Sequence, residues 1–170
     1  FAQAAQPRPE ARLIVVDDAG EREVTLGWVY EQARRIAGGL NALGVEKVIL
    51  NSITTEQPDI VSRAAAMAGS SRVVASIDGR RNWMGKYTVC VRGGRSDTRR
   101  DPAEHAQEME RLGAGQILLN AIDRDRTMEG FDLALVSRVA EAVSIPVVAA
   151  GGAGKPSHLR EAVEKGASAV

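Results

Sequence analysis

Residues 111–154, RLGAGQILLNAIDRDRTMEGFDLALVSRVAEAVSIPVVAAGGAG, decide the fold. A Gly-rich turn precedes an apolar run at 116–122, which favours a strand buried on both faces. Apolar residues then recur at helical spacing over 133–143, and Pro146 opens a second short apolar run. Strand, helix and strand of this kind form a parallel crossover unit, whose chemistry lies at the carboxyl ends of the strands.

The same alternation continues through the chain from Lys47 onward. We expect strands near 47–52, 72–77, 116–122, 146–150 and 167–170, and helices near 58–68, 102–112, 133–143 and 158–165. Asp101 is expected to begin the helix at 102–112, with Glu104 completing a capping box. This rhythm is typical of a (β/α)-barrel segment or of an open doubly wound sheet. No Gly-x-Gly-x-x-Gly opens a helix after a strand, which argues against a doubly wound sheet that binds a dinucleotide. The sequence therefore favours an α/β fold built as a barrel segment.

Composition limits the classes of function. Lys plus Arg and Asp plus Glu number 22 each, so the zero net charge predicts neither nucleic-acid nor membrane-surface binding. Cys90 is the only cysteine, which excludes an internal disulfide and favours a reducing, cytoplasmic location. No apolar run approaches the length of a membrane span. Because the first residue is Phe1, we expect a fragment or a processed product.

Polar residues close the expected strands, and in a barrel they would share one rim. They are Asn51, Ser52, Asp78, Asp123, Asp125, Gly151 and Gly152. A carboxylate at such a rim can act as a general acid or base, or it can simply cap a loop or pair with an arginine. The Gly-Gly turn and the Asn-Ser pair can each hold a phosphate, or can be plain turns.

Three other residues are interpreted without a catalytic role. His105 and His158 lie in helical patterns with no second ligand at metal spacing, so we expect surface histidines. Cys90 has no companion that suggests a nucleophile, and we expect a buried thiol or one at the edge of the sheet.

Several longer motifs occur in one order between Glu46 and Val170. They are EKVILNS (46–52), VVASID (73–78), LGAGQILL (112–119), IDRD (122–125), MEGFDL (128–133) and IPVVAAGGAG (145–154). Together they resemble the cyclase subunit of imidazole glycerol phosphate synthase, the HisF family, which is a (β/α)8 barrel of histidine biosynthesis. The resemblance runs from the family's fourth strand to the start of its eighth. It implies a partial TIM-type barrel.

The resemblance also implies an activity and roles for individual residues. Enzymes of this family are lyases that join ammonia from a glutaminase subunit to a phosphorylated ribulosyl aminoimidazole, with no metal or cofactor. Asp78 matches one of two catalytic aspartates. The implied phosphate-binding residues are Asn51 and Ser52 for one phosphate and Asp125, Gly151 and Gly152 for the other, while Lys47 and Gln116 match the ammonia entrance.

The chain departs from the family pattern at several positions. Arg126 stands where a glycine is expected, and Gln116 stands where the ammonia entrance has a glutamate. The family's first three strands have no clear counterpart, and the eighth begins only at 167–170. We therefore expect an incomplete barrel, or one completed by a second copy of the chain.

Residues 1–45 form a different kind of segment. We expect a hairpin with strands at 13–16 and 23–26, followed by a helix at 28–43. The segment weakly resembles the N-terminal region of adenylate-forming enzymes, from which no function is carried over. A cruder alternative is that residues 13–18 replace the first barrel strand. Two domains, 1–45 and 46–170, are predicted.

Three functions stay open at this point. The first is the cyclase of histidine biosynthesis. The second is a paralogue that uses ammonia to amidinate a surface-sugar precursor. Residues 83–87, 129–131 and 164–170 resemble that branch more than the histidine enzyme. The third is a non-catalytic, fused or truncated half-barrel. Ligand binding separates the first two from the third, and the identity of the ligand separates the first from the second.

Overall fold

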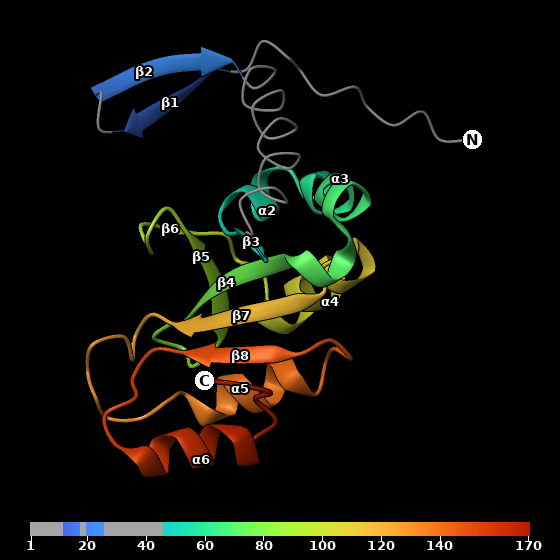
Figure 1. Cartoon of the computed structure of the whole chain (residues 1–170). Helices are drawn as coiled ribbons and strands as arrows, with labels where there is room; N and C mark the ends of the chain where they lie inside the picture. Colours follow the sequence, from blue (N-terminus) through green and yellow to red (C-terminus); the bar gives the residue numbers. More distant parts are fainter. Residues whose placement is uncertain (1–11, 18–19, 26–45) are drawn as a thin grey trace. The chain divides into compact units, whose positions relative to one another are not determined.

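A computed structural model describes residues 12–17, 20–25 and 46–170 (Figure 1). The chain divides into two compact units, Phe1–Glu46 and Lys47–Val170. In the first unit, β1 (Arg12–Asp17) pairs antiparallel with β2 (Gly20–Thr25), which confirms the predicted hairpin. The helix expected at 28–43 lies outside the described residues.

The second unit is built on a mixed sheet with a parallel centre. Its parallel strands are β3 (Val48–Leu50), β4 (Val73–Arg81), β7 (Gln116–Ala121) and β8 (Val147–Ala150). The antiparallel strands are β5 (Tyr87–Val91) and β6 (Ser96–Asp97). The strands follow the order β6, β5, β4, β7 and β8, with β3 also paired to β4 (Figure 1). The predicted crossover units are therefore present.

Strand β4 is longer than the sequence predicted. The expected strand ended at residue 77, whereas β4 continues to Arg81. Its first half pairs with β3, from Val73 to Ala75, and its second half pairs antiparallel with β5, from Asp78 onward. The hairpin that follows thus supplies hydrogen-bond partners beyond the point where the barrel strand was expected to stop.

Five α-helices connect and cover these strands. They are α2 (Ile53–Glu56), α3 (Asp59–Ala68), α4 (Pro102–Arg111), α5 (Leu133–Ala140) and α6 (Pro156–Glu164), with a 3-10 turn at Ser70–Arg72. Asp101 begins α4 as predicted, because its Oδ1 accepts from the backbone N–H of Ala103 at 2.9 Å. Asp132 begins α5 in the same way. No helix in the described ranges is long and apolar enough to span a bilayer.

The core lies between the sheet and the helices, on one face of the strands. In β7 the buried residues alternate with half-exposed ones, and β8 follows the same pattern. The expectation that 116–122 is buried on both faces was therefore wrong. Among the described helices, packing is on the face that carries Ile117 and Leu119, and it includes α5 with its fully buried Leu135 and Val139. We call the opposite side, which carries Leu118, Asn120, Val148 and Ala150, the half-exposed face.

The last expected strand, 167–170, is reduced to one bridge. Val148 and Ala169 are parallel partners, and the backbone N–H of Ala149 donates to the Ala169 carbonyl at 2.9 Å. Within the described residues, the sheet does not close on itself. The arrangement is a partial barrel, as predicted.

One side-chain contact connects the β4–β5 hairpin to helix α5. The Tyr87 hydroxyl donates to both carboxylate oxygens of Asp132, at 2.8 and 3.0 Å. Asp132 in turn caps α5 through the backbone N–H of Leu135 at 3.0 Å. Burial, and then the bond to Asp132, raise the pKa of Tyr87 to about 12.

We expect Tyr87→Phe to lower the free energy of unfolding at pH 7 by about 1 kcal/mol, because the cap loses its hydroxyl donor. Since the folded state holds the phenol proton more tightly, wild-type stability should fall as pH rises above the ordinary pKa of 10.0 toward about 12. The variant should show a smaller fall. Urea unfolding at pH 7 and above pH 10 measures both effects, and equal stability at pH 7 would show that the contact contributes nothing.

Candidate functional site

A carboxylate lies on the half-exposed face, near the carboxyl end of β7. Asp78 lies in β4 directly opposite Asn120 of β7, so the two side chains point to the same side of the sheet. The Asn120 amide donates to Asp78 Oδ1 at 3.3 Å, and the Asn51 amide donates to Asp78 Oδ2 at 3.3 Å. Two amides, one from β7 and one just after β3, therefore hold the two oxygens of one half-buried carboxylate.

The sequence predicted Asp78 and Asn51 for this rim but missed two of their partners. Asn120 was hidden in an apolar run, although it is the one polar residue between Ile117 and Ala121. Ser76, which is 8% exposed, accepts from the Asn51 amide at 3.2 Å. Only the register of β4 against β7 shows that Asn120 faces the carboxylate.

Ser52 lies beside Asn51, where the chain leaves β3. Its hydroxyl is 3.3 Å from the Asn51 side-chain oxygen and accepts from the backbone N–H of Arg92 at 3.0 Å. The Arg92 guanidinium pairs with Glu56 of α2 at 3.0 Å. The predicted Asn-Ser pair is thus brought next to Asp78, and the loop after β5 contacts Ser52 through the backbone of Arg92.

The Gly-Gly turn after β8 packs against the loop after β7. Gly152 has φ +102, and a Cβ there would lie 2.3 Å from the Gly130 carbonyl oxygen. The Gly130 N–H donates to the Gly152 carbonyl at 2.7 Å. A Cβ at Gly151 would lie 2.8 Å from the side-chain oxygen of Asn120. Close packing alone therefore requires glycine at both positions, whether or not a phosphate binds there.

The carboxylates after β7 have different surroundings. Asp123 accepts from the backbone N–H of Arg81 at 2.8 Å, so it caps a loop, which is the simpler of the two sequence interpretations. Asp125 is exposed, and its Oδ2 lies 3.8 Å from Nε of Arg126. Arg126 has φ +64, a left-handed conformation that glycine adopts more easily. The backbone thus keeps a glycine-like shape at this departure from the family pattern.

The two residues predicted at the ammonia entrance meet at the opposite end of the sheet. Lys47 precedes β3 and Gln116 begins β7, and the Lys47 ammonium donates to the Gln116 side-chain oxygen. A neutral amide thus accepts from the ammonium, where the family's glutamate would supply a charge. The polar pair and the Asp78 rim lie at opposite ends of the same strands.

Both histidines are buried, so the prediction of surface histidines was wrong. His158 is 7% exposed, and its Nδ1 accepts from the backbone N–H of Gly154 at 3.2 Å, which ties α6 to the Gly-rich turn. His105 is 2% exposed and shares the buried face of α4 with Pro102, Ala106 and Met109. This spacing of three and four residues could have revealed its burial.

Titration of two buried groups follows from their surroundings. Burial lowers the pKa of His105 below its ordinary value of 6.5, against the opposing pull of the Glu108 carboxylate. Burial also raises the pKa of the Cys90 thiol. Cys90 is 1% exposed, as the sequence predicted, so it remains a protonated core thiol rather than a nucleophile.

Most of the chain matches known proteins of histidine biosynthesis. The family model described as "Histidine biosynthesis protein" matches residues 31–170. Imidazole glycerol phosphate synthase subunit HisF of Thermococcus onnurineus (strain NA1) is 46% identical over 128 residues, which make up 75% of this chain and 50% of that relative. The chain thus spans about half the length of the curated relative it matches.

These matches confirm the resemblance on which the sequence prediction rested. The family fold is a TIM barrel, and the open parallel sheet of β3, β4, β7 and β8 corresponds to part of one. The match covers most of the chain and includes every strand and helix of the Lys47–Val170 unit. The chain therefore belongs to the histidine biosynthesis protein family.

Proposed function

We propose that the rim centred on Asp78 is a cyclase site of the imidazole glycerol phosphate synthase type. The reaction joins ammonia to a phosphorylated ribulosyl aminoimidazole and releases imidazole glycerol phosphate and an aminoimidazole carboxamide ribotide. The observation that carries the proposal is the half-buried Asp78 carboxylate, held by Asn51 and Asn120 on the half-exposed face. A carboxylate fixed in this way can exchange protons with a substrate above the sheet.

The two ends of the substrate are assigned to the two sides of this carboxylate. Asn51 and Ser52 bind one phosphate through their side chains and backbone N–H groups. Gly151, Gly152 and Asp125 bind the other, where the turn after β8 meets the loop after β7. The tight packing of this turn supports the assignment, because it presents a rigid backbone to an anion.

Ammonia is proposed to enter at the opposite end of the strands. Lys47 and Gln116 are the gate residues, and a glutaminase subunit is the partner that supplies ammonia there. The free, buried thiol of Cys90 supports a cytoplasmic location for this chemistry. Residues 46–170 are assigned to the barrel domain and residues 1–45 to a separate hairpin-helix domain.

Calorimetric titration with imidazole glycerol phosphate tests the proposal, with the mass in solution measured on the same sample. We expect saturable binding that is lost in Gly152→Glu, because the new side chain fills the proposed phosphate position. Gly69→Glu is the matched control. Gly69 also has a positive φ (+89), but a Cβ there meets nothing within 4 Å, and the residue ends α3.

Each outcome bears on the proposal. Binding that survives Gly152→Glu would move the ligand away from the Gly-rich turn. A folded chain that does not bind would contradict the cyclase site and leave a non-catalytic half-barrel. A mass of two chains together with binding would indicate that a second copy supplies the facing strands.

A further inference from the structure

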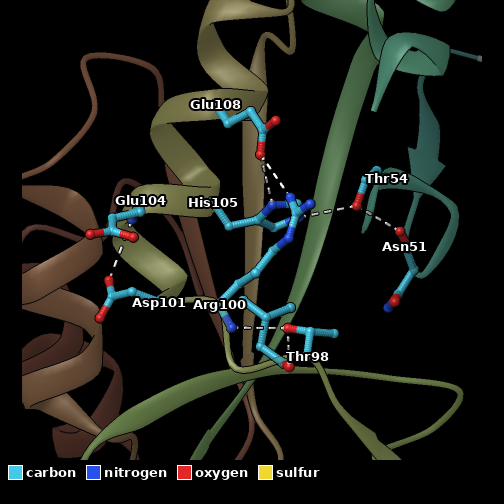
Figure 2. A network of polar contacts seen from close by, with 9 residues as sticks. Asn51, Thr54, Thr98, Arg100, Asp101, Glu104, His105 and Glu108 are labelled. Carbon is cyan, nitrogen blue, oxygen red and sulfur yellow. Dashed lines mark hydrogen bonds and ion pairs between the residues drawn. The ribbon is translucent and has the colours of Figure 1, made fainter. Parts of the chain in front are cut away.

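A buried polar relay runs from α4 to the candidate site (Figure 2). The His105 side chain is fully buried between α4 and α2. Its Nε2 lies 3.2 Å from the Thr54 hydroxyl, and the Thr54 hydroxyl donates to the backbone carbonyl of Asn51 at 2.8 Å. Asn51 is the residue whose amide holds Asp78. A core histidine is therefore two contacts away from the rim.

The positions of the protons in this relay follow from counting donors. The Thr54 hydroxyl has one hydrogen, and it gives that hydrogen to Asn51. Toward His105 it must therefore accept, so the ring carries its proton on Nε2. Nδ1 is then a bare lone pair, and among the described residues it has no hydrogen-bond partner.

Charged groups on the other side of the ring agree with this assignment. Glu108 lies on α4 with its Oε2 at 3.7 Å from His105 Nδ1, which is too far for a hydrogen bond. The same oxygen accepts from Arg100 at 2.9 Å (Figure 2). Because Arg100 already neutralises Glu108, the carboxylate does not require a charged histidine beside it.

A hydroxyl, an imidazole and a carboxylate in this order also suggest a nucleophilic triad. The surroundings exclude that role. Thr54 is 1% exposed, so no substrate can reach its hydroxyl, and its hydrogen is already given to a backbone carbonyl. A relay that is closed to solvent and ends on a backbone group can only orient that group.

We propose that His105 is a positioning residue for the candidate phosphate site, acting through Thr54 on the peptide of Asn51. This inference rests on the proposed function, which places a phosphate at Asn51 and Ser52. The Asn51 carbonyl accepts from both the backbone N–H of Thr54 at 2.9 Å and the Thr54 hydroxyl. These bonds set the plane in which the chain leaves β3, and that plane determines where the Asn51 amide meets Ser76 and Asp78.

Nuclear magnetic resonance tests the relay without any ligand. Nitrogen-15 spectra of the wild-type chain should show a neutral His105 with the proton on Nε2. His105→Gln keeps a donor near that position, whereas His105→Leu removes it. We expect the side-chain amide signals of Asn51 to shift in His105→Leu and to stay close to wild type in His105→Gln. Unchanged Asn51 signals in His105→Leu, or a proton on Nδ1, would overturn the inference.

A second pair of variants covers the case in which His105→Leu does not fold. Thr54→Val removes the hydroxyl at nearly constant volume, and Thr54→Ser keeps it. Only Thr54→Val should shift the Asn51 signals. If the valine and serine variants give the same Asn51 signals, the relay does not orient Asn51.

Affinity then links the relay to the site. The dissociation constant for imidazole glycerol phosphate should rise about five- to tenfold in His105→Leu and in Thr54→Val, since one net hydrogen bond contributes on that order. It should rise less than about twofold in His105→Gln. The double variant should bind no more weakly than either single one, because both break the same chain of contacts.

The two proposals fail in different ways. A wild-type chain that does not bind the ligand contradicts the proposed function, and the ligand-free spectra still decide whether His105 orients Asn51. Binding that is equally strong in His105→Leu, Thr54→Val and wild type would leave the proposed function standing and overturn the positioning role.

Discussion

Asp78→Asn is expected to slow ammonia-dependent turnover by about 10²- to 10⁴-fold, the range typical of a lost general acid or base. The amide has nearly the shape of the carboxylate but cannot carry the proton. Affinity for imidazole glycerol phosphate should fall by less than about tenfold, because only the Asn51 contact changes while the proposed phosphate position at Gly151 and Gly152 keeps its surroundings.

The surroundings of Asp78 add a smaller structural cost. Asn51 and Asn120 each donate to one oxygen of the carboxylate. The asparagine side chain offers only one acceptor oxygen to these two donors. One contact therefore places two N–H donors against each other until one of the amides flips. Such a mismatch costs about 1 kcal/mol of stability. It does not account for a hundredfold loss of rate.

Single-turnover rates with an ammonium salt as the nitrogen source measure the effect. Asp59→Asn is the control, since Asp59 is an exposed carboxylate on α3 that pairs with Arg63 at 3.1 Å. Turnover that is unchanged in Asp78→Asn would remove Asp78 from the mechanism. A loss of affinity as large as the loss of rate would assign the residue to binding instead.

The fold could be predicted from the sequence wherever the pattern is local. A few neighbouring residues are enough to recognise a short apolar run, a proline after a helical stretch, or Asp101 before α4. The corresponding elements are present. The length of β4 was missed because its second half is held by β5, a partner that comes later in the chain. The one-sided burial of β7 was missed because the apolar run Ile117–Leu119 looks the same whether one face or both are covered.

The residues of the candidate site also differ in whether local sequence could reveal them. Asp78 and Asn51 could be found because each follows an apolar run, where the end of a strand is expected. Asn120 could not be found, because the role of a single polar residue in a strand depends on which residue of the neighbouring strand lies opposite. Here that residue is Asp78. The burial of His105 and His158 was not predicted because the lack of a second metal ligand at the right spacing says nothing about which helical face a histidine occupies. His105 is on the buried face of α4, and its polar neighbours include Thr54, from α2, and Glu108, from its own helix.

Gly152→Ala is expected to lower the free energy of unfolding by about 2–4 kcal/mol, through two separate effects. Gly152 has φ +102, a conformation that costs an L-residue about 1–2 kcal/mol. In addition, its Cβ would lie 2.3 Å from the Gly130 carbonyl oxygen, which is backbone and cannot rotate away. The loop after β7 must therefore shift, and the 2.7 Å bond from the Gly130 N–H to the Gly152 carbonyl is strained or lost.

Gly69→Ala separates these two effects. Gly69 has a similar φ of +89, but nothing lies within 4 Å of its Cβ position, so only the conformational cost of about 1–2 kcal/mol applies. Urea unfolding of both variants gives the difference, which is the cost of the clash alone and should exceed about 1 kcal/mol. Equal losses in the two variants would mean that the Gly130 loop yields freely. The turn after β8 would then not be the rigid backbone that the proposed phosphate site requires. Asp125, which lies on the Gly130 loop, would likewise not be held in place for the phosphate.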